Sequence, residues 1–447
     1  MTATRETMTA RLLTVEEARA AVLGSVEGPL EVELIETTAG LRRVLARPVH
    51  AATDLPPWDN SAMDGYAVRA ADVAAASEDA PARLRVVGEV AAGEAPTMRV
   101  EAGRAVRIAT GAPVPTGADA VVPVELTTPL DDAGRPSGPR GRDATGPLPA
   151  GCLVHAPAGR GASIRRRGDD LTAGSVLVPA GSELTPASIA VMAGAGVGSI
   201  AVHRRVRVAV LATGDEIRAA GEPLGPAGIP DANGPGLAAL VEDAGAEALR
   251  LGIARDDLAE VTSRLLAAVA VADVVIVSGG VSVGPYDVVR SAFAAIGSVD
   301  LWRVAVQPGK PFAFGLARRT DGRRPVALFG LPGNPVSSFV TFELFVRPAI
   351  RRLAGRTDLF RPIDRCTLTE GVAKSHGRRA FLRVIAERDG SGSPVRDQAG
   401  RVRARLAGGQ GSHVLSALAA ADGLAVVPEE AQAAEPGTEY PLWWLDR

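Results

Sequence analysis

The stretch from Ala272 to Val289 constrains the fold of this chain more than any other. Val274 to Val277 is a run of β-branched apolar residues, which is typical of a strand buried on both faces. Glycine-rich turns follow, and an amphipathic helix is predicted to begin at Pro285 and to continue to about Ile296. A strand, a glycine-rich turn and a helix together let backbone N–H groups approach an anion at the helix N-terminus.

Asp287 does not suit a plain phosphate-binding loop. It lies in the first predicted helical turn, where its negative charge would repel a phosphate. A carboxylate there is either a partner of the helix dipole or a ligand of a metal ion that joins the protein to the phosphate. The residues of this stretch alone leave both interpretations open.

Composition excludes several classes of protein. The chain has 447 residues and a formal net charge of −2, so nothing indicates a nucleic-acid footprint. No apolar run reaches the length of a membrane span, and residues 1–11 carry no signal-peptide core. Cys152 and Cys366 have no ligand spacing and indicate a reducing compartment. We therefore expect a soluble cytoplasmic protein of several domains.

The periodicity of apolar residues changes along the chain. Residues 53–68 concentrate polar and aromatic side chains without periodicity, which favours a functional loop over an ordinary turn. Short alternating runs from 83 to 124 indicate an all-β unit. From Val206 strands alternate with helices, the pattern of a doubly wound α/β domain, and from about Arg361 the pattern is β again.

Turns of the α/β segment are expected to converge on one edge of its sheet. In doubly wound sheets, ligands bind outside the carboxyl ends of the strands. The turns there are predicted to supply backbone loops for anions (Thr213-Gly214, Ser278 to Gly284 and Pro332 to Pro335), carboxylates (Glu216, Asp256 and Asp287) and a cation (Lys310). Anion loops beside carboxylates indicate a polyphosphate with a divalent ion between, and such oxygen ligands suit Mg²⁺.

Each of these features also has an ordinary structural explanation. The glycines suit tight turns, Glu216 suits a cap or a surface charge, and Asp256 with Asp257 suits a helix start. No histidine stands in these loops to act as a base. The residues therefore predict a metal-dependent enzyme that acts on a nucleotide-like or phosphorylated small molecule. It would work by positioning and by Lewis-acid polarisation of a phosphoryl group.

Several motifs stand in an order that resembles a known family. They are Asn60-Ser-Ala-Met-Asp-Gly-Tyr-Ala67, Thr110-Gly-Ala-Pro-Val-Pro115, Ala212-Thr-Gly-Asp-Glu216, Ser278-Gly-Gly-Val-Ser-Val-Gly284 with Asp287, Pro308-Gly-Lys-Pro311 and Leu331-Pro-Gly-Asn-Pro335. Together they are similar to the molybdopterin molybdenumtransferases, the MoeA/gephyrin E-domain family. The resemblance covers nearly the whole chain beyond the tail and residues 128–150. Its specificity comes from the combination, since no single motif is specific.

The resemblance implies a multidomain α/β plus β protein. Its parts would be a central doubly wound α/β molybdopterin-binding domain, an all-β inserted domain, a small linking domain and a C-terminal β domain. The expected boundaries are a flexible tail (1–11), a linking or dimerisation domain (12–47 and 151–182), the inserted β domain (48–127), a flexible insertion (128–150), the α/β domain (183–357) and the C-terminal β domain (358–447).

The resemblance also implies a reaction and an assembly. Adenylylated molybdopterin and molybdate would give molybdenum cofactor and AMP, with Mg²⁺ as the divalent metal. The protein would be an elongated homodimer whose active site lies between the α/β domain of one subunit and the β domain of the other. Transient contact with molybdopterin-handling proteins or molybdoenzymes is expected, and contact with nucleic acid or a membrane is not.

Residue roles follow from the resemblance by motif match. Asp64, Thr110, Glu216, Asp256, Asp287 and Lys310 would be catalytic, with Glu216 and Asp287 at the metal and with Asp64 and Thr110 supplied by the partner subunit. The substrate-binding set would be Thr213, Gly214, Ser278, Gly279, Gly280, Ser282, Gly284, Pro332, Gly333, Asn334, Pro335, Ser337, Arg379 and Ser412. Lys310, Arg379 and Ser412 would meet molybdate.

The sequence departs from the family pattern in two segments. Gln307 stands where the family usually has a second lysine, which removes one positive charge that Arg303 would partly replace. The segment around Asp231 and Asn233 is enriched in Gly and Pro, so the helix start there is expected to be altered.

Rival functions are a molybdopterin adenylyltransferase-like enzyme and a non-enzymatic gephyrin-like scaffold. Chain length and the Asp64 loop disfavour the first, and the sequence has no linker to a partner domain for the second. Tungstate in place of molybdate stays open, because the two anions are nearly isosteric.

Overall fold

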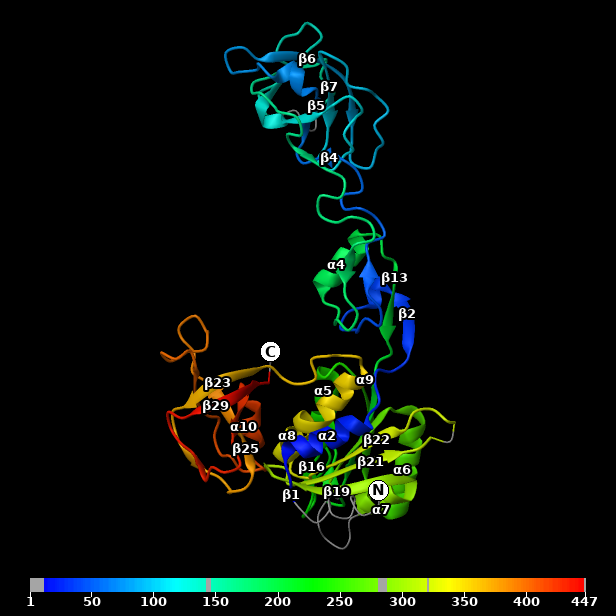
Figure 1. Cartoon of the computed structure of the whole chain (residues 1–447), viewed down its shortest axis with the longest axis vertical. Coiled ribbons are helices and arrows are strands. Elements are labelled where there is room, and N and C mark those ends of the chain that lie inside the picture. The colour runs from blue at the N-terminus through cyan, green and yellow to red at the C-terminus, as the bar shows by residue number, and fades with distance from the viewer. Residues whose placement is uncertain (1–11, 142–145, 280–287, 320, 446–447) are drawn as a thin grey trace.

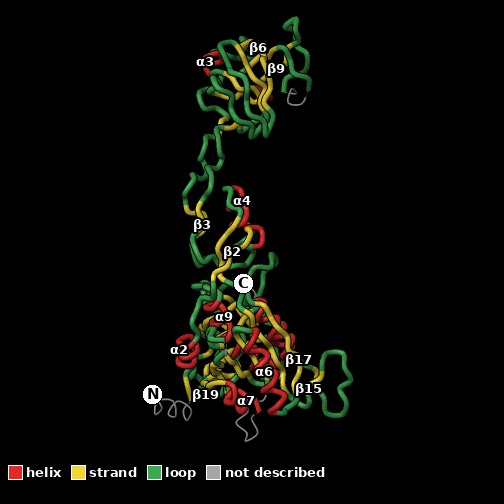
Figure 2. The backbone as a smooth tube through the Cα atoms, turned by 90° about the vertical axis from the view of Figure 1, so that its right-hand side faces the viewer, coloured by secondary structure: helices red, strands yellow, loops and turns green. Residues whose placement is uncertain are grey.

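The computed structural model describes residues 12–141, 146–279, 288–319 and 321–445. A central α/β body lies beside a C-terminal β body, and a narrow linking unit connects the α/β body to an outer β unit at the far end of the molecule (Figure 1). Figure 2 shows the same elongated arrangement after a quarter turn. Within the described residues, no helix has both the length and the apolar character needed to cross a membrane.

The central body is built on a seven-stranded sheet of order β1-β19-β21-β22-β18-β14-β17. Parallel neighbours form its larger part: β17 (Glu247–Ala254), β14 (Arg207–Thr213), β18 (Val274–Ser278) and β22 (Val326–Leu331). The antiparallel strand β21 (Pro311–Ala317) leads to β19 (Gly297–Val304) and β1 (Leu12–Leu13). Every residue of β18 is buried, as its β-branched run predicts.

Helices cover both faces of this sheet, which confirms the doubly wound architecture. One face packs against α2 (Val15–Ser25), α5 (Asn233–Asp243) and the continuous helix formed by α8 (Pro335–Thr341), the π-helical segment η3 (Phe342–Val346) and α9 (Arg347–Leu353). The other face packs against α6 (Leu258–Val271) and α7 (Val288–Ile296). The predicted start of α7 at Pro285 lies outside the described residues.

The N-terminal helix belongs to the central body. Thr14 caps α2 with a reciprocal capping box: its hydroxyl accepts from the Glu17 N–H at 3.1 Å, and the Glu17 carboxylate accepts from the Thr14 N–H at 2.9 Å. Leu13 and Val15 are fully buried in the α/β core, and β1 pairs with β19. Residues 12–26 therefore pack with the α/β domain, although we expected the linking domain to begin at residue 12.

The linking unit has its own small core. It consists of β2 (Val32–Glu36) paired with β13 (Ser199–His203), β3 (Val49–His50) paired with β12 (Val176–Val178), the short η1 (Thr37–Ala39), and α4 (Pro186–Gly194). Leu45, Leu184 and Ile200 pack together there. The segment 183–203 thus lies in the linking unit, where we expected the α/β domain.

The outer unit contains a six-stranded sheet of order β8-β5-β7-β6-β10-β9. Its strands are β8 (Ala120–Pro123), β5 (Gly65–Val68), β7 (Arg104–Ile108), β6 (Ala82–Val90), β10 (Gly151–Val154) and β9 (Thr127–Leu130), with α3 (Ala70–Val73) and η2 (Val124–Leu126) beside them. A separate pair joins β4 (Asn60–Ser61) to β11 (Ile164–Arg165). Because β9 and β10 pair with each other, both ends of the expected 128–150 insertion are strands of this sheet.

The C-terminal body is a closed β-barrel. Its sheet runs β25 (Arg379–Ala386), β26 (Val402–Leu406), β23 (Ile363–Leu368), β29 (Glu439–Trp444) and β27 (Gly423–Val427), and β27 pairs back with β25. Closure leaves these strands without free edges. The pair β24 (Val372–Ala373) and β28 (Ala433–Ala434) and the helix α10 (Leu415–Ala419) complete the body. The strand β20 (Val306–Gln307) pairs with β25 and ties the barrel to the α/β body.

Candidate functional site

Three parallel strands end at the same level and create the candidate site. In β14, β18 and β22, the residues Ala212, Ser278 and Leu331 are register partners, so the loops that follow lie side by side. A cavity of about 600 Å³ opens there. The lining residues are Ala212, Thr213, Gly214, Glu216, Ile217, Ile229, Pro230, Asp231, Ala232, Asn233, Asp256, Ser278, Gly279, Pro311, Pro332, Gly333, Asn334, Pro335, Ser337 and His413.

Glycine is required at position 279, where the loops after β14 and β18 touch. Gly279 has a φ of +98°, and a Cβ built on it would lie 2.4 Å from the carbonyl oxygen of Thr213. A Cβ on Gly333 would lie 3.8 Å from the Cα of Gly279. A side chain at position 279 would force the β14 and β18 loops apart, so the glycine keeps the bottom of the cavity narrow and lined by backbone.

Ser278 lines the cavity and has a hydroxyl without an identified partner. The residue is only 2% exposed, and its buried Oγ has no hydrogen-bond partner among the residues that the structure describes. Buried hydroxyls in proteins are almost always hydrogen-bonded, because leaving one unpaired costs free energy. An oxygen-rich ligand in the cavity would supply the missing acceptor.

Carboxylates gather on the other side of the same cavity. Glu216 and Asp256 line it, and Asp215 lies next to them, accepting from the Asp256 N–H at 3.4 Å. Burial, and then the negative charges of Asp215 and Glu216, raise the pKa of Asp256. Asp257, and not Asp256, caps α6 by accepting from the Glu260 N–H at 2.8 Å. Asp256 is therefore free of the helix-start role that the sequence left open.

Crowded carboxylates of this kind fit a divalent cation. Mg²⁺ is commonly held by one or two carboxylates together with substrate phosphates. A cation between Glu216 and Asp256 would relieve the repulsion that raises the pKa of Asp256. The described part of the chain contains no group of three or more His, Cys, Asp or Glu residues arranged for a metal, so the protein would supply only part of the shell.

The segment with Asp231 and Asn233 also contributes to the cavity. The helix α5 begins at Asn233, and the Asp231 carboxylate accepts from the Gly234 N–H at 2.8 Å. The Asn233 amide donates to the carbonyl oxygen of Gly333 at 2.7 Å, which fixes the loop after β22. We expected the Gly and Pro residues to alter the helix start, but the helix begins within the motif at Asn233, and this first residue supports the opposite loop.

The C-terminal body reaches the edge of the same cavity. The carbonyl oxygen of Ser412 accepts from the Val336 N–H at 3.3 Å, at the start of α8, and His413 lines the cavity. Arg383 holds this loop: its buried guanidinium donates to the carbonyl oxygens of Gly409 and Gly411, each at 3.1 Å. Burial lowers the pKa of Arg383 to about 10.

The β20–β21 turn lies beside the cavity, but its Lys310 is not one of the lining residues. Pro311 is part of the lining, and Lys310, its neighbour, is half-buried with its carbonyl accepting from the Val304 N–H at 3.0 Å. The side chain of Gln307 turns to the barrel, where its oxygen accepts from the Ser375 N–H at 2.9 Å.

Other predicted residues lie elsewhere in the chain. Arg379 forms ion pairs with Glu16 and Glu429 and is not part of the cavity lining. In the outer unit, the Asp64 carboxylate accepts from the N–H and the hydroxyl of Thr110 at 2.7 and 2.8 Å. Figure 1 shows the linking unit between this outer unit and the α/β body. Gly280, Ser282, Gly284 and Asp287 lie outside the described residues.

Sequence reasoning missed several of the lining residues. His413, Ile217, Ile229 and Pro230 were not assigned to a site. The pair β15 (Ile217–Arg218) and β16 (Ile229–Pro230) carries most of them to the cavity edge. A motif-based signal existed for His413, because it directly follows the predicted Ser412.

The fold and the cavity define a class of protein: an α/β domain with a cavity at the carboxyl edge of its sheet, carried between β units. Family models match in the same order, namely the MoeA N-terminal region (domains I and II) over residues 13–196, a probable molybdopterin binding domain over 209–352 and the MoeA C-terminal region (domain IV) over 365–444.

Similar proteins carry consistent names. A protein named molybdopterin molybdenumtransferase 2 from Mycobacterium tuberculosis (strain CDC 1551 / Oshkosh) is 39% identical, over 90% of this chain and 92% of its own. A molybdopterin molybdenumtransferase from Haemophilus influenzae is 34% identical, over 94% and 95%. The crystal structure of a molybdopterin biosynthesis MoeA protein from Pyrococcus horikosii aligns with a TM-score of 0.74 at 31% identity, covering 97% and 99%. The chain therefore belongs to the MoeA family and is an enzyme, a transferase.

Proposed function

We propose that this protein inserts molybdate into adenylylated molybdopterin, giving molybdenum cofactor and releasing AMP. The observation that carries the proposal is the composition of one cavity, which Ser278, Glu216 and Asp256 line together and where the Ser278 hydroxyl has no partner among the described residues. A ligand with both phosphate oxygens and a bridging cation would satisfy both sides at once. The proposal extends the names of the relatives, which state molybdenum transfer to molybdopterin.

The substrate phosphates would be held by backbone and hydroxyl groups. The loops after β18 and β22 approach each other at Gly279 and Gly333, where no side chain blocks access to the main chain. Ser278 would donate its free hydroxyl to a phosphate oxygen, and the N-terminus of α8 behind Asn334 and Pro335 would favour negative charge.

Carboxylates would hold a magnesium ion against the pyrophosphate. Glu216 and Asp256 have the oxygen chemistry for it, and Asp287 is a further candidate on the neighbouring loop. The bound ion would neutralise phosphate charge and favour departure of AMP. Without it, the carboxylates would repel the substrate that Ser278 and the glycine loops attract.

Molybdate would enter beside the C-terminal body. The backbone of Ser412 contacts the start of α8, and Lys310 adjoins the lining residue Pro311, so these two residues would supply a hydroxyl and an ammonium to the anion. Arg379 would join them only after leaving its ion pairs with Glu16 and Glu429. We therefore place Lys310 and Ser412 ahead of Arg379 as ligands of the anion.

The remaining predicted groups would come from a second copy of the chain. Asp64 and Thr110 form a hydrogen-bonded pair, but the linking unit stands between them and the cavity (Figure 1). We propose a homodimer in which the outer unit of one subunit completes the cavity of the other. We further propose that it works in the cytoplasm and passes its product to molybdoenzymes by transient contact.

A single-turnover assay tests the function. Purified protein would be mixed with adenylylated molybdopterin, Mg²⁺ and molybdate, and AMP release would be followed over time. AMP should appear only with molybdate and Mg²⁺ together, and Glu216→Gln should remove the burst while leaving the melting curve unchanged. The absence of AMP above the enzyme-free control, from a folded dimer, would reject the proposal. A parallel series with tungstate distinguishes the two oxyanions.

A further inference from the structure

A second cavity lies at the opposite edge of the seven-stranded sheet. Asp273 and Pro325, which precede β18 and β22, line it together with Arg204, so it sits at the amino ends of the parallel strands. Its volume is about 140 Å³. An apolar cavity of roughly this size holds a molecule such as benzene.

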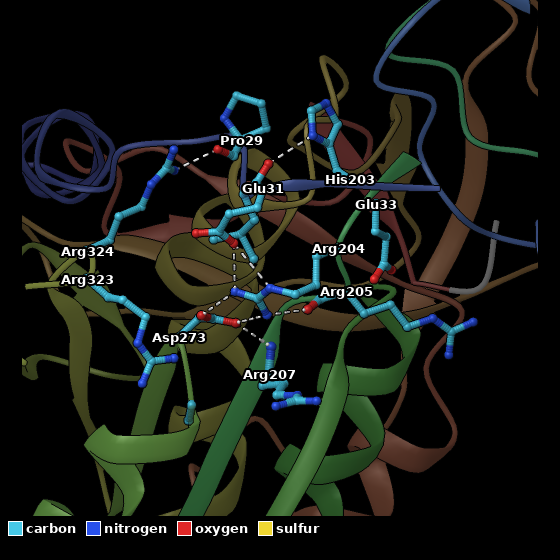
Figure 3. Close-up of polar contacts among 12 residues, drawn as sticks. Pro29, Glu31, Glu33, His203, Arg204, Arg205, Arg207, Asp273, Arg323 and Arg324 are labelled. Carbon is cyan, nitrogen blue, oxygen red and sulfur yellow. Dashed lines mark hydrogen bonds and ion pairs between the residues drawn. The ribbon is translucent and has the colours of Figure 1, made fainter. Parts of the chain in front are cut away.

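The cavity forms where the chain passes between the central body and the linking unit. The chain crosses this junction twice, once after α2 near Leu30 and Glu31 and once between β13 and β14 at Arg204. All three residues belong to the lining. Figure 3 shows Arg204 of the second crossing between Glu31 of the first crossing and Asp273 of the α/β body, with hydrogen bonds to both.

Part of the wall is apolar and rigid. Val26, Leu30, Ala327 and Leu353 line the cavity and are each 5% exposed or less, and Leu316 adds a partly buried side chain. Val26 is the C-cap of α2, and Leu30 lies in the segment that follows it. The other three residues come from α9 and from the strands β21 and β22, and all five belong to one core. Transfer of an apolar ring from water into contact with these residues would be favourable, because it buries apolar surface.

Arginines form the rest of the wall. Arg204 is neutralised, because both guanidinium ends donate to Asp273 at 2.9 Å and the same side chain pairs with Glu31. Arg323 pairs with Asp321 at 2.6 Å. Arg324 donates to the carbonyl oxygens of Glu27 and Pro29, at 3.1 and 2.6 Å, and forms no ion pair with a carboxylate within the described ranges (Figure 3).

Arg319 is the buried member of this group. Its side chain is 6% exposed and donates to the carbonyl oxygens of Ala270 and Ala272. Asp273 lies 3.6 Å away, but it is already held by Arg204. Among the described residues, the Nε of Arg319 has no hydrogen-bond partner. A buried guanidinium with an unused donor and a shared counter-charge is costly unless an anion completes it.

We propose that this cavity binds a small organic carboxylate whose apolar body is about the size of one aromatic ring. The carboxylate would meet Arg319 and Arg324, and the ring would lie against Val26, Leu30 and Leu353. Guanidinium groups recognise carboxylates through their N–H donors. The remaining carboxylate of the lining, Glu27, forms no ion pair with these arginines in the part of the chain that the structure describes.

Calorimetric titration of the full-length protein with benzoate tests the site. Benzoate should bind once per chain, while benzamide, which keeps the ring, and acetate, which keeps the charge, should each bind at least roughly tenfold more weakly. Arg324→Gln should weaken benzoate by about tenfold, because Arg324 is exposed and its loss leaves the core packed. Arg99→Gln, an exposed arginine of the outer unit, is the matched control and should have no effect.

Other results would overturn the proposal. These are absence of saturation at several millimolar benzoate, equal binding of benzamide, or equal effects of Arg324→Gln and Arg99→Gln with unchanged melting curves. Loss of benzoate binding in Ser278→Ala would place the ligand at the carboxyl-edge cavity and would also reject it. The outcome is independent of molybdenum transfer, since no step of the titration uses that reaction.

Discussion

The proposed site residues lie in two regions, the α/β cavity and the Asp64–Thr110 pair, and the two are assembled differently. The cavity is formed within one chain, because the register of β14, β18 and β22 aligns the loops that carry Thr213, Ser278 and Pro332. The Asp64–Thr110 pair is complete as a local hydrogen-bonded unit, but it lies in the outer unit, apart from this cavity. A residue pair can therefore have complete local hydrogen bonding although the proposed active site still needs residues from another part of the assembly.

The first prediction removes the negative charge of the Asp64–Thr110 pair. Asp64→Asn should lower single-turnover AMP release by roughly 100-fold or more, because a charge placed at the reacting group acts mainly in the transition state. Stabilisation of the folded protein by Mg²⁺ should persist, since Glu216 and Asp256 are untouched. Asp72→Asn, which removes a carboxylate from the same unit, where it accepts from the Gly103 N–H, is the control. Equal rates for the two variants would remove Asp64 from the site.

The second prediction removes a single hydroxyl group from the α/β cavity. Ser278→Ala removes a hydroxyl that makes no hydrogen bond to any residue that the structure describes, so the melting temperature should change little. The KM for adenylylated molybdopterin should rise about tenfold, the value of one hydrogen bond to a charged group.

Ser338→Ala is the matched control for that variant. The Ser338 hydroxyl donates to the carbonyl oxygen of Pro332, so its loss should cost about 1–2 kcal/mol of stability. A destabilised Ser278→Ala protein with unchanged KM would show that the Ser278 hydroxyl has a structural role instead.

The third prediction concerns charge in the cavity. Because the pKa of Asp256 is raised, the folded protein binds that proton more tightly than the unfolded chain does. The stability that this proton contributes is present below the ordinary carboxyl pKa and is lost as pH rises through the raised value. Asp256→Asn, neutral at every pH, should therefore melt higher than the parent at pH 7 without Mg²⁺, and should match it in acid.

Added Mg²⁺ should reverse the difference in melting temperature between the parent and Asp256→Asn. Added Mg²⁺ should raise the melting temperature of the parent more than that of Asp256→Asn, because the ion binds between carboxylates only in the folded state. Thermal melts over pH with and without Mg²⁺ measure both effects. An identical Mg²⁺ shift in parent and variant would show that Asp256 is not a metal ligand.

The fourth and smallest effect is expected at Gln307. Its side chain accepts from the Ser375 N–H of the barrel and is not part of the cavity lining, so Gln307→Lys should change molybdate affinity by less than about threefold. Arg303→Gln tests in the same titration whether that arginine replaces the missing charge. A large gain in affinity for Gln307→Lys would show that the lysine reaches the anion.

Local patterns explain how much of the fold was predictable. The β-branched run in β18, the capping box at Thr14 and the helix start at Asp257 each depend on neighbours within a few residues, so the sequence sets them directly. The pairing of Leu12 and Leu13 with Arg303 and Val304 is set by packing over a long separation, so no local signal revealed that α2 belongs to the α/β core. Closure of the barrel between β25 and β27 is hidden for the same reason.

The candidate site divides in the same way. Thr213, Ser278 and Pro332 follow directly from strands, and each could be placed by the rule that ligands bind at carboxyl ends. His413 and Asn233 reach the cavity through tertiary contacts of the α10 loop and the α5 start, which the sequence does not display. Arg379 suited an anion site by type, yet nearby Glu16 and Glu429 occupy it.

The most direct test of a site shared between two chains is activity of a purified heterodimer of Asp64→Asn and Glu216→Gln subunits, isolated with two affinity tags. Each homodimeric variant should be inactive. In the heterodimer, one cavity combines an intact Glu216 with an intact Asp64 from its partner, so AMP release should return to about half of the wild-type value per dimer. No recovery, with a folded heterodimer, would mean that Asp64 and Glu216 must belong to the same chain and would contradict the shared site.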